Sequence, residues 1–334
     1  MHGWIVLDKP VGPGSTEAVT AVKRALRAGG YPKLKVGHGG TLDPLASGVL
    51  PVAIGEATKL AGRLLDSDKI YEFTIRFGEE TATLDAEGEV IATSHVRPLR
   101  RDIEAVLERF RGEQDQIPPV YSALKINGQR AYELARSGQE IELATRRVNI
   151  KYLGALGMLP VRSEARLPPI EQSDFRSAVR SFFERERATH AGKYERVREV
   201  TLTAHVSKGT YIRSLARDIA LALGTVGHVT MLCRTKAGPF WIHHALSLDK
   251  LTELGHARRL EEILLPLRAG LDDIPALSLT LDQAGALRQG RVLAGIAADA
   301  VRDGGQAFAM LGDTPVALVE VRDREVRVVR GFNL

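Results

Sequence analysis

Asp43 has the sequence surroundings best suited to chemistry. It follows a glycine-rich loop, Gly37–Gly40, and immediately precedes Pro44. Glycines let the backbone take conformations that other residues cannot adopt, and they let a ligand approach closely. An aspartate presented by such a loop can act as a nucleophile or a base. A structural role fits the local sequence equally well, because Asp-Pro is a common turn pair.

The segment 209–213 is a second candidate, because Tyr211 and Arg213 lie two positions apart at an expected strand-to-helix junction. An arginine can hold a carboxylate ionised and oriented through a charge-assisted pair. An aromatic ring can stack on a nucleobase. The alternative is an arginine that faces solvent and a tyrosine that packs in the core. Tyr71 lies in an alternating strand pattern and permits the same two interpretations.

The sequence contains no motif that indicates a cofactor or a metal. The loop before Asp43 lacks the Gly-Lys-Ser/Thr ending of a phosphate-binding P-loop, and no dinucleotide-binding fingerprint occurs. Cys233 is the single cysteine, and its spacing from His228 matches no zinc site. The sequence motifs therefore give no candidate residues for a cofactor or a metal.

Apolar periodicity places the candidate residues between regular elements. Asp43 would lie in a loop before a buried strand, and Tyr71 near the start of an alternating strand. The main elements expected in the body of the chain are strands at residues 3–7, 49–55, 69–78 and 199–206, and helices at residues 57–65, 101–111 and 211–223. In the tail we expect a short helix at residues 281–289 and strands at residues 307–311, 315–321 and 325–330.

Composition narrows the class of protein. The chain has 334 residues and 44% hydrophobic residues, which is ordinary for a globular protein of one large and one small domain. Its net charge of +5 suits a polyanionic partner such as a nucleic acid. One cysteine cannot form an intramolecular disulfide, and no apolar run is long enough for a signal peptide or a membrane span. We therefore expect a cytoplasmic protein.

Six ordered motifs together resemble the TruB family of pseudouridine synthases, of the bacterial type. They are residues 3–10 (GWIVLDKP), 36–51 (VGHGGTLDPLASGVLP), 55–59 (GEATK), 66–71 (DSDKIY), 116–125 (QIPPVYSALK) and 207–215 (SKGTYIRSL). The resemblance covers most of residues 3–150 and 199–245. It is the order of all six motifs that is specific, rather than any one of them.

The resemblance implies an α+β (mixed α/β) fold with a central mixed or antiparallel sheet. Residues 1–272 would form the catalytic domain, and residues 273–334 a small β-rich RNA-binding domain similar to the PUA type. Residues 118–150 would form a mobile clamp over the RNA. The Arg/Glu-rich stretch 160–198 looks like an insertion, an exposed helix or a mobile segment, that could contact the tRNA backbone.

The resemblance also implies a reaction and its catalytic residues. Uridine 55 in the T-arm loop of tRNA would be isomerised to pseudouridine by a monomer that needs no cofactor and no protein partner. Asp43 would be the nucleophile, Arg213 its charge partner, and Tyr71 the ring that lies against the uracil. The resemblance leaves open whether Asp43 attacks the ribose or the base.

Five further positions would bind the substrate. The resemblance places Tyr211 and Leu232 in the wall of the uridine pocket. His38 would fill the space that the extruded uridine leaves in the T-loop. Lys59 and Lys125 would bind the RNA.

Two other functions fit the same sequence. One is an enzyme of the same family that acts on another RNA, such as ribosomal RNA or a guide-directed target. The other is an RNA-binding or RNA-folding protein without catalysis, which the presence of Asp43, Tyr71 and Arg213 together disfavours.

Overall fold

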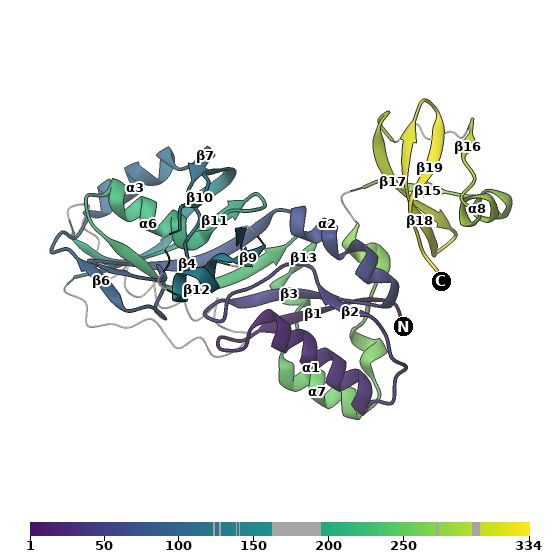
Figure 1. The fold of residues 1–334 in the computed structure, drawn as a ribbon, viewed down its shortest axis with the longest axis horizontal. Coiled ribbons are helices and arrows are strands. Elements are labelled where there is room, and N and C mark those ends of the chain that lie inside the picture. The colour runs from purple at the N-terminus through teal and green to yellow at the C-terminus, as the bar shows by residue number, and fades with distance from the viewer. Residues whose placement is uncertain are drawn as a thin grey trace.

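The computed structural model describes residues 1–161, 195–271, 274–295 and 301–334, apart from residues 123, 127, 138 and 140. The Arg/Glu-rich stretch expected at residues 160–198 therefore lies almost wholly outside the described residues. The described chain has a mixed α/β fold built on a large central sheet, with a separate smaller sheet at the C-terminal end (Figure 1). The predicted fold class is thus confirmed.

A ten-stranded sheet forms the centre of the molecule. One pair, β3 with β12, is parallel, and the other neighbours in the sheet pair antiparallel. Along the main path the order is β14 (Leu265–Pro266), β1 (Gly3–Lys9), β3 (Ser47–Ile54), β12 (Gly227–Ala237), β4 (Lys69–Phe77), β11 (Val197–Val206), β10 (Arg146–Pro160) and β7 (Gly112–Gln116). Two short strands, β2 (Val36–His38) and β13 (Phe240–Trp241), pair with β3 and β12.

Helices pack against this sheet and enclose the main apolar core. The helices are α1 (Ser15–Ala28), α3 (Arg100–Arg109), α6 (Ile212–Ala222) and α7 (Leu248–His256), and α1 packs on α7 (Figure 1). Helix α6 packs on β12 and β4. Its apolar residues Ile212, Leu215 and Ile219 recur at helical spacing and are buried with Phe73 and Ile75 of β4. This packing fixes where the first turn of α6 lies.

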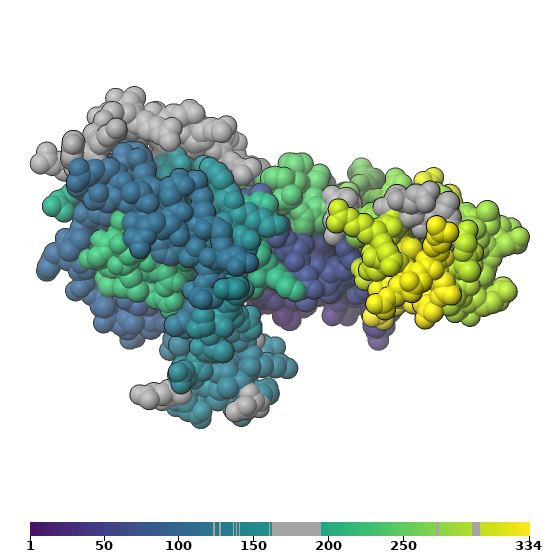
Figure 2. Space-filling model, turned by 90° about the horizontal axis from the view of Figure 1, so that it is seen from above, coloured from purple at the N-terminus to yellow at the C-terminus, as the bar shows by residue number. Residues whose placement is uncertain are grey.

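The segment expected to be a clamp leaves the body of the molecule. It holds β8 (Lys125–Ile126), β9 (Gln129–Arg130) and α4 (Ala131–Arg136), and it projects at the bottom of Figure 2. Its last residues already belong to β10. A further hairpin, β5 (Glu79–Thr81) with β6 (Val90–Thr93), precedes it in the chain.

The C-terminal tail forms a five-stranded sheet with its own apolar core. The strand order is β15 (Ala276–Ser278), β17 (Gly305–Leu311), β18 (Thr314–Arg322), β19 (Glu325–Gly331) and β16 (Leu293–Ala294), with α8 (Leu281–Arg288) beside it. The three strands and the helix predicted for the tail are therefore present. The chain end packs against the part of the molecule that contains the large sheet, because Phe332 is buried in one cluster with Trp4 of β1.

The prediction of a helix at residues 57–65 is wrong for its first half, which is not α-helical. A 3₁₀ helix, η1 (Gly55–Leu60), precedes a single turn of α-helix, α2 (Ala61–Asp66). Residues three apart eclipse one another in a 3₁₀ helix, and Lys59 Nζ accordingly lies 2.7 Å from Glu56 Oε2. Thr58 Oγ1 also donates to Gly55 O (2.7 Å), which satisfies a carbonyl of the tighter turn.

Candidate active site

Asp43 lies in the loop between β2 and β3, and the loop is fixed on both sides of it. Gly40 has φ +145°, a conformation that side-chain-bearing residues rarely adopt. Ser15 Oγ accepts a hydrogen bond from Leu42 N (2.8 Å) and donates to Leu42 O (3.0 Å). Ala46 N donates to Asp43 O (3.0 Å), which closes a turn. The main chain is therefore held while the Asp43 side chain stays 43% exposed.

Arg213, in the first turn of α6, binds Asp43. Its Nη2 donates to Asp43 Oδ2 (2.7 Å) and to Tyr121 O (3.0 Å). Its Nη1 donates to Thr83 O (2.9 Å) and lies 3.3 Å from Asp85 Oδ2. A guanidinium has a planar, fixed set of donors, so four acceptors around it determine its position. The Asp43 carboxylate thus faces a cation that cannot easily move away.

Asp43 and Arg213 both line a cavity of about 180 Å³. Its wall includes five of the predicted site residues, which come from distant parts of the chain: Asp43, Tyr71, Tyr211, Arg213 and Leu232. Thr41, Leu42, Ala46, Thr210 and Ile212 complete the wall. The cavity combines one partly exposed carboxylate, two aromatic rings and four apolar side chains, a composition that suits a planar ring with a polar edge.

Tyr211 is held at this cavity by its main chain. Gln116, at the end of β7, accepts from Tyr211 N (2.8 Å) and donates to Tyr211 O (3.1 Å). Burial raises the pKa of the Tyr211 phenol above its ordinary value. The phenol therefore stays protonated at neutral pH and can present its ring without a charge.

The other predicted substrate-binding residues lie outside this cavity wall. His38 is in β2, and Lys125 is exposed in β8 of the projecting segment. Lys59 is in η1, where Nζ donates to Glu56 Oε2 (2.7 Å) and to Gly331 O (2.9 Å). Burial, together with the nearby Arg234 charge, lowers the pKa of His38. His38 is therefore neutral near pH 7.

Comparison with known proteins supports one family. The model of the TruB family pseudouridylate synthase N-terminal domain matches residues 23–167, and that of the tRNA pseudouridylate synthase B C-terminal domain matches residues 213–272. The tRNA pseudouridine synthase B of Novosphingobium aromaticivorans is 55% identical over 334 residues, which cover 100% of this chain and 98% of the relative. That of Zymomonas mobilis is 52% identical, with 100% and 96% covered. The chain belongs to the TruB family. It is therefore an enzyme of an isomerase family.

The fold of this chain is also similar to that of chains in solved structures. A chain from an H/ACA RNP bound to a substrate RNA containing 2'-deoxyuridine matches with a TM-score of 0.66 and 25% identity, over 99% of this chain and 85% of that one. A chain from a Cbf5-Nop10-Gar1 complex matches with a TM-score of 0.66 and 26% identity, over the same shares of the two chains. Both likenesses extend over nearly the whole chain.

Asp85 is a site residue that sequence reasoning missed. Its side chain is buried, pairs with Arg213 and accepts from Glu87 N (3.1 Å). It follows Leu84, a non-glycine residue with φ +63°. The turn has no apolar periodicity, so the sequence offered no signal for a buried carboxylate here.

Two buried cations beneath the Asp43 loop were also missed. Lys9 is 0% exposed, and its Nζ donates to Pro10 O and Pro13 O, both at 2.8 Å. Arg234 is 1% exposed, and it donates to the main-chain oxygens of Val49 (2.8 Å), Thr41 (3.1 Å) and Gly40 (3.4 Å). Arg234 thereby ties the loop before Asp43 to β3.

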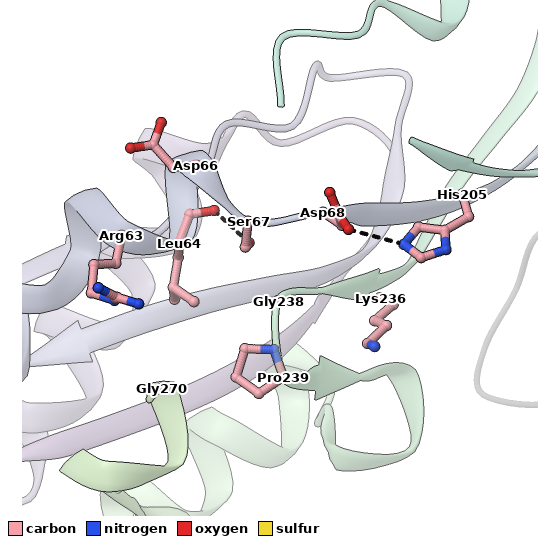
Figure 3. A pocket seen from close by; sticks show the side chains of 10 residues that line it. All are labelled: Arg63, Leu64, Asp66, Ser67, Asp68, His205, Lys236, Gly238, Pro239 and Gly270. Carbon is pink, nitrogen blue, oxygen red and sulfur yellow. Dashed lines mark hydrogen bonds and ion pairs between the residues drawn. The ribbon is translucent and has the colours of Figure 1, made fainter. Parts of the chain in front are cut away.

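A larger cavity, of about 460 Å³, contains none of the predicted site residues (Figure 3). It is lined by the α2–β4 turn, by the turn at Gly238, and by His205 and Lys236, which both pair in register with Ile70 of β4. Asp68 points toward His205 there (Figure 3), with Oδ2 and Nε2 3.4 Å apart. This cavity contains charges of both signs, and it is separate from the Asp43 site.

Within the described part of the chain, no group of three or more His, Cys, Asp or Glu residues is arranged to hold a metal ion. Within the same residues, no helix is both long and apolar enough to cross a membrane.

Proposed function

We propose that this chain isomerises uridine 55 in the T-arm loop of tRNA to pseudouridine, with Asp43 as the nucleophile. Two full-length relatives at 55% and 52% identity carry the name tRNA pseudouridine synthase B. The observation that supports the catalytic assignment best is the 2.7 Å pair of Asp43 and Arg213 at the mouth of a cavity walled by Tyr71. The cytoplasmic location expected from the sequence belongs to the same proposal.

The reaction requires no net oxidation or hydrolysis. The bond between N1 of uracil and C1′ of the ribose breaks, the freed ring turns, and a bond between C5 and C1′ forms. C5 loses its proton, and N1, freed from C1′, gains one. Between these steps, a nucleophile can bond to either the ribose or the uracil ring. An ionised carboxylate suits that role.

Arg213 gives Asp43 a fixed charge partner. Its guanidinium donates to Asp43 Oδ2 over 2.7 Å and is itself held by main-chain oxygens. When RNA covers the cavity and excludes water, the attraction between the two groups becomes stronger, because the local dielectric falls. The pair also fixes the direction in which the second carboxylate oxygen points.

The target uridine must leave its stack to reach this cavity, which costs a few kcal/mol. Stacking of the extruded base on Tyr71 would offset part of this cost, by about 1–3 kcal/mol for one aromatic contact. His38, neutral near pH 7, can fill the space that the uridine leaves in the loop. We propose that Tyr71, in the same cavity wall as Asp43, also assists removal of the C5 proton.

Other parts of the chain would bind the RNA at a distance from the reaction. The projecting segment with Lys125 would close over the T-arm, and the C-terminal sheet would act as a PUA-like RNA-binding domain at residues 273–334. Shape and backbone contacts would dominate recognition, as is usual for folded RNA. We propose that the chain does this as a monomer, without the protein partners present in the RNP relatives.

Tritium release tests the proposal directly. The substrate is tRNA transcript labelled with [5-³H]uridine, and wild type is compared with Asp43→Asn. We expect release by wild type, located to the T-loop uridine, and none by Asp43→Asn, with tRNA affinity kept within about tenfold. Release from ribosomal RNA but not from tRNA would support the alternative substrate class. Binding of tRNA without any release would support an RNA-binding protein without catalysis.

A further inference from the structure

A third cavity, of about 250 Å³, adjoins the Asp43 cavity. The two share four wall residues: Thr41, Tyr71, Thr210 and Tyr211. A nucleotide whose base occupied the Asp43 cavity would therefore have its neighbouring backbone at or near this second opening. The proposed mechanism gives this cavity no role.

Two buried cations line the adjoining cavity, and none of its lining residues is acidic. Lys69 is 7% exposed and Arg234 is 1% exposed. Lys69 Nζ donates to Leu64 O (2.8 Å), Leu65 O (2.8 Å) and Ser67 O (2.5 Å), and Arg234 likewise binds main-chain oxygens. Carbonyl oxygens satisfy the donors, but they carry no net charge that would neutralise the two cations.

The carboxylates near Lys69 are engaged with other cations. Asp66 Oδ1 lies 2.9 Å from Lys208 Nζ, and Asp68 pairs with Lys151 and His205. Burying a charge without a partner of opposite sign is costly. An anion in this cavity would therefore be bound more strongly than at an ordinary surface position.

The rim of the cavity supplies uncharged donors as well. Gly209 has φ +79° in the turn before α6. Among the described residues, the main-chain N–H groups of Gly209 and Thr210 have no hydrogen-bond acceptor. Successive N–H groups in such turns form concavities that bind anions. Both residues line the cavity.

We propose that this cavity binds one phosphate of the RNA backbone, directly next to the nucleotide in the Asp43 cavity. The proposal rests on the proposed function, and it assigns Lys69 and the turn at Gly209 to substrate binding. The phosphate supplies a negative charge beside Lys69 and Arg234, whose hydrogen bonds go to main-chain oxygens. It also anchors the extruded nucleotide from its backbone, independently of the stack on Tyr71.

A double-mutant cycle that combines a substitution in the enzyme with a neutral linkage in the RNA tests this subsite. T-arm stem-loop RNAs carry one uncharged methylphosphonate linkage, placed 5′ of the target uridine, 3′ of it, or in the distal stem. Single-turnover conversion by wild type and by Lys69→Met gives the enzyme concentration at half-maximal rate for each RNA. At one of the two flanking positions, we expect the neutral linkage to raise this concentration about tenfold for wild type and less than about threefold for Lys69→Met, because the two changes remove the same electrostatic interaction.

Matched variants separate this effect from folding and from net charge. Lys69→Gln removes the charge but keeps a polar N–H donor group in place of the ammonium, so it tests the proposal even if Lys69→Met folds poorly. Lys236→Met removes a lysine that lines the cavity of Figure 3, and it should leave the tenfold effect of the neutral linkage unchanged. The proposal would be overturned if, at both flanking positions, the neutral linkage changed the half-maximal concentration by the same factor for wild type and for the two Lys69 variants. Failure of wild type to convert the unmodified RNA would instead overturn the proposed function.

Discussion

The Arg213 and Asp43 side chains are 2.7 Å apart, yet the arginine is 7% exposed and the aspartate 43%. The protein buries the cation and presents the anion. Arg213 is held by main-chain oxygens and by a second carboxylate, so it does not depend on Asp43 for its position. Asp43 can therefore change its bonding during a reaction while its charge partner stays in place.

Arg213→Lys tests this asymmetry. A lysine keeps the positive charge, but it cannot span the four acceptors that the planar guanidinium binds. We expect the single-turnover rate constant to fall about 10²-fold, the size typical of losing one positioned electrostatic contact. Quench-flow measurement of pseudouridine formation gives this rate. Arg217→Lys, one turn further along α6, is the matched control, and an equal loss in both variants would contradict the assignment.

Asp85→Asn tests the buried end of the same network. The amide keeps the size of the carboxylate but removes its charge, so Arg213 would lose the buried ion pair that helps to hold it beside Asp43. We expect the rate constant to fall about tenfold or more while tRNA affinity changes less than about threefold. Filter binding measures the affinity. A loss of affinity with an unchanged rate would show that Asp85 supports RNA binding instead.

The sequence predicts this site only in part, and the missed residues share a cause. Asp43 and Arg213 were identifiable from their motifs, but no spacing rule brings together residues that lie so far apart in the chain. Asp85 lies in an irregular turn, where apolar periodicity gives no information. Lys9 and Arg234 carry charges, and hydropathy places charged residues at the surface. Only the fold shows that main-chain oxygens satisfy them in the core.

The secondary structure was predictable where periodicity was strong. The strand that starts at Lys69 and the helix that follows Tyr211 were predicted to within one residue at each end. The helix expected at residues 57–65 instead begins as a 3₁₀ turn, in which Lys59 pairs with Glu56 three residues earlier. Side-chain pairing of this kind is not visible in hydropathy.

Lys59→Ala tests whether Lys59 binds RNA or only the C-terminal tail. Its Nζ binds Glu56 and Gly331 O in this structure, so RNA would have to compete for it or share it. We expect about tenfold weaker tRNA binding and a plot of log affinity against log salt whose slope is smaller by about one, as for one lost phosphate contact. Lys250→Ala removes a similar lysine, 2.7 Å from Glu253, and is the control. A lower melting temperature with unchanged affinity would restrict Lys59 to the tail contact.

Lys9→Met tests the buried cation beneath the Asp43 loop through its pH dependence. Burial lowers the pKa of Lys9 to about 8 in the folded chain, against an ordinary value of 10.5. Above pH 8 the folded state therefore releases a proton that the unfolded state keeps, so the free energy of unfolding gains a contribution that grows as pH rises. We expect the stability difference between wild type and Lys9→Met to increase by roughly 2–3 kcal/mol between pH 8 and 10.5.

Urea unfolding at a series of pH values measures this difference. Subtracting the unfolding free energy of Lys9→Met from that of wild type cancels the titration of groups common to both proteins. The same substitution at the exposed Lys23 controls for the loss of one charge. A difference that stays constant from pH 7 to 10.5 would mean that Lys9 titrates alike in both states. Its buried amine would then be stabilised fully by the carbonyl oxygens of Pro10 and Pro13, and the cost of burying this charge near Asp43 would be small.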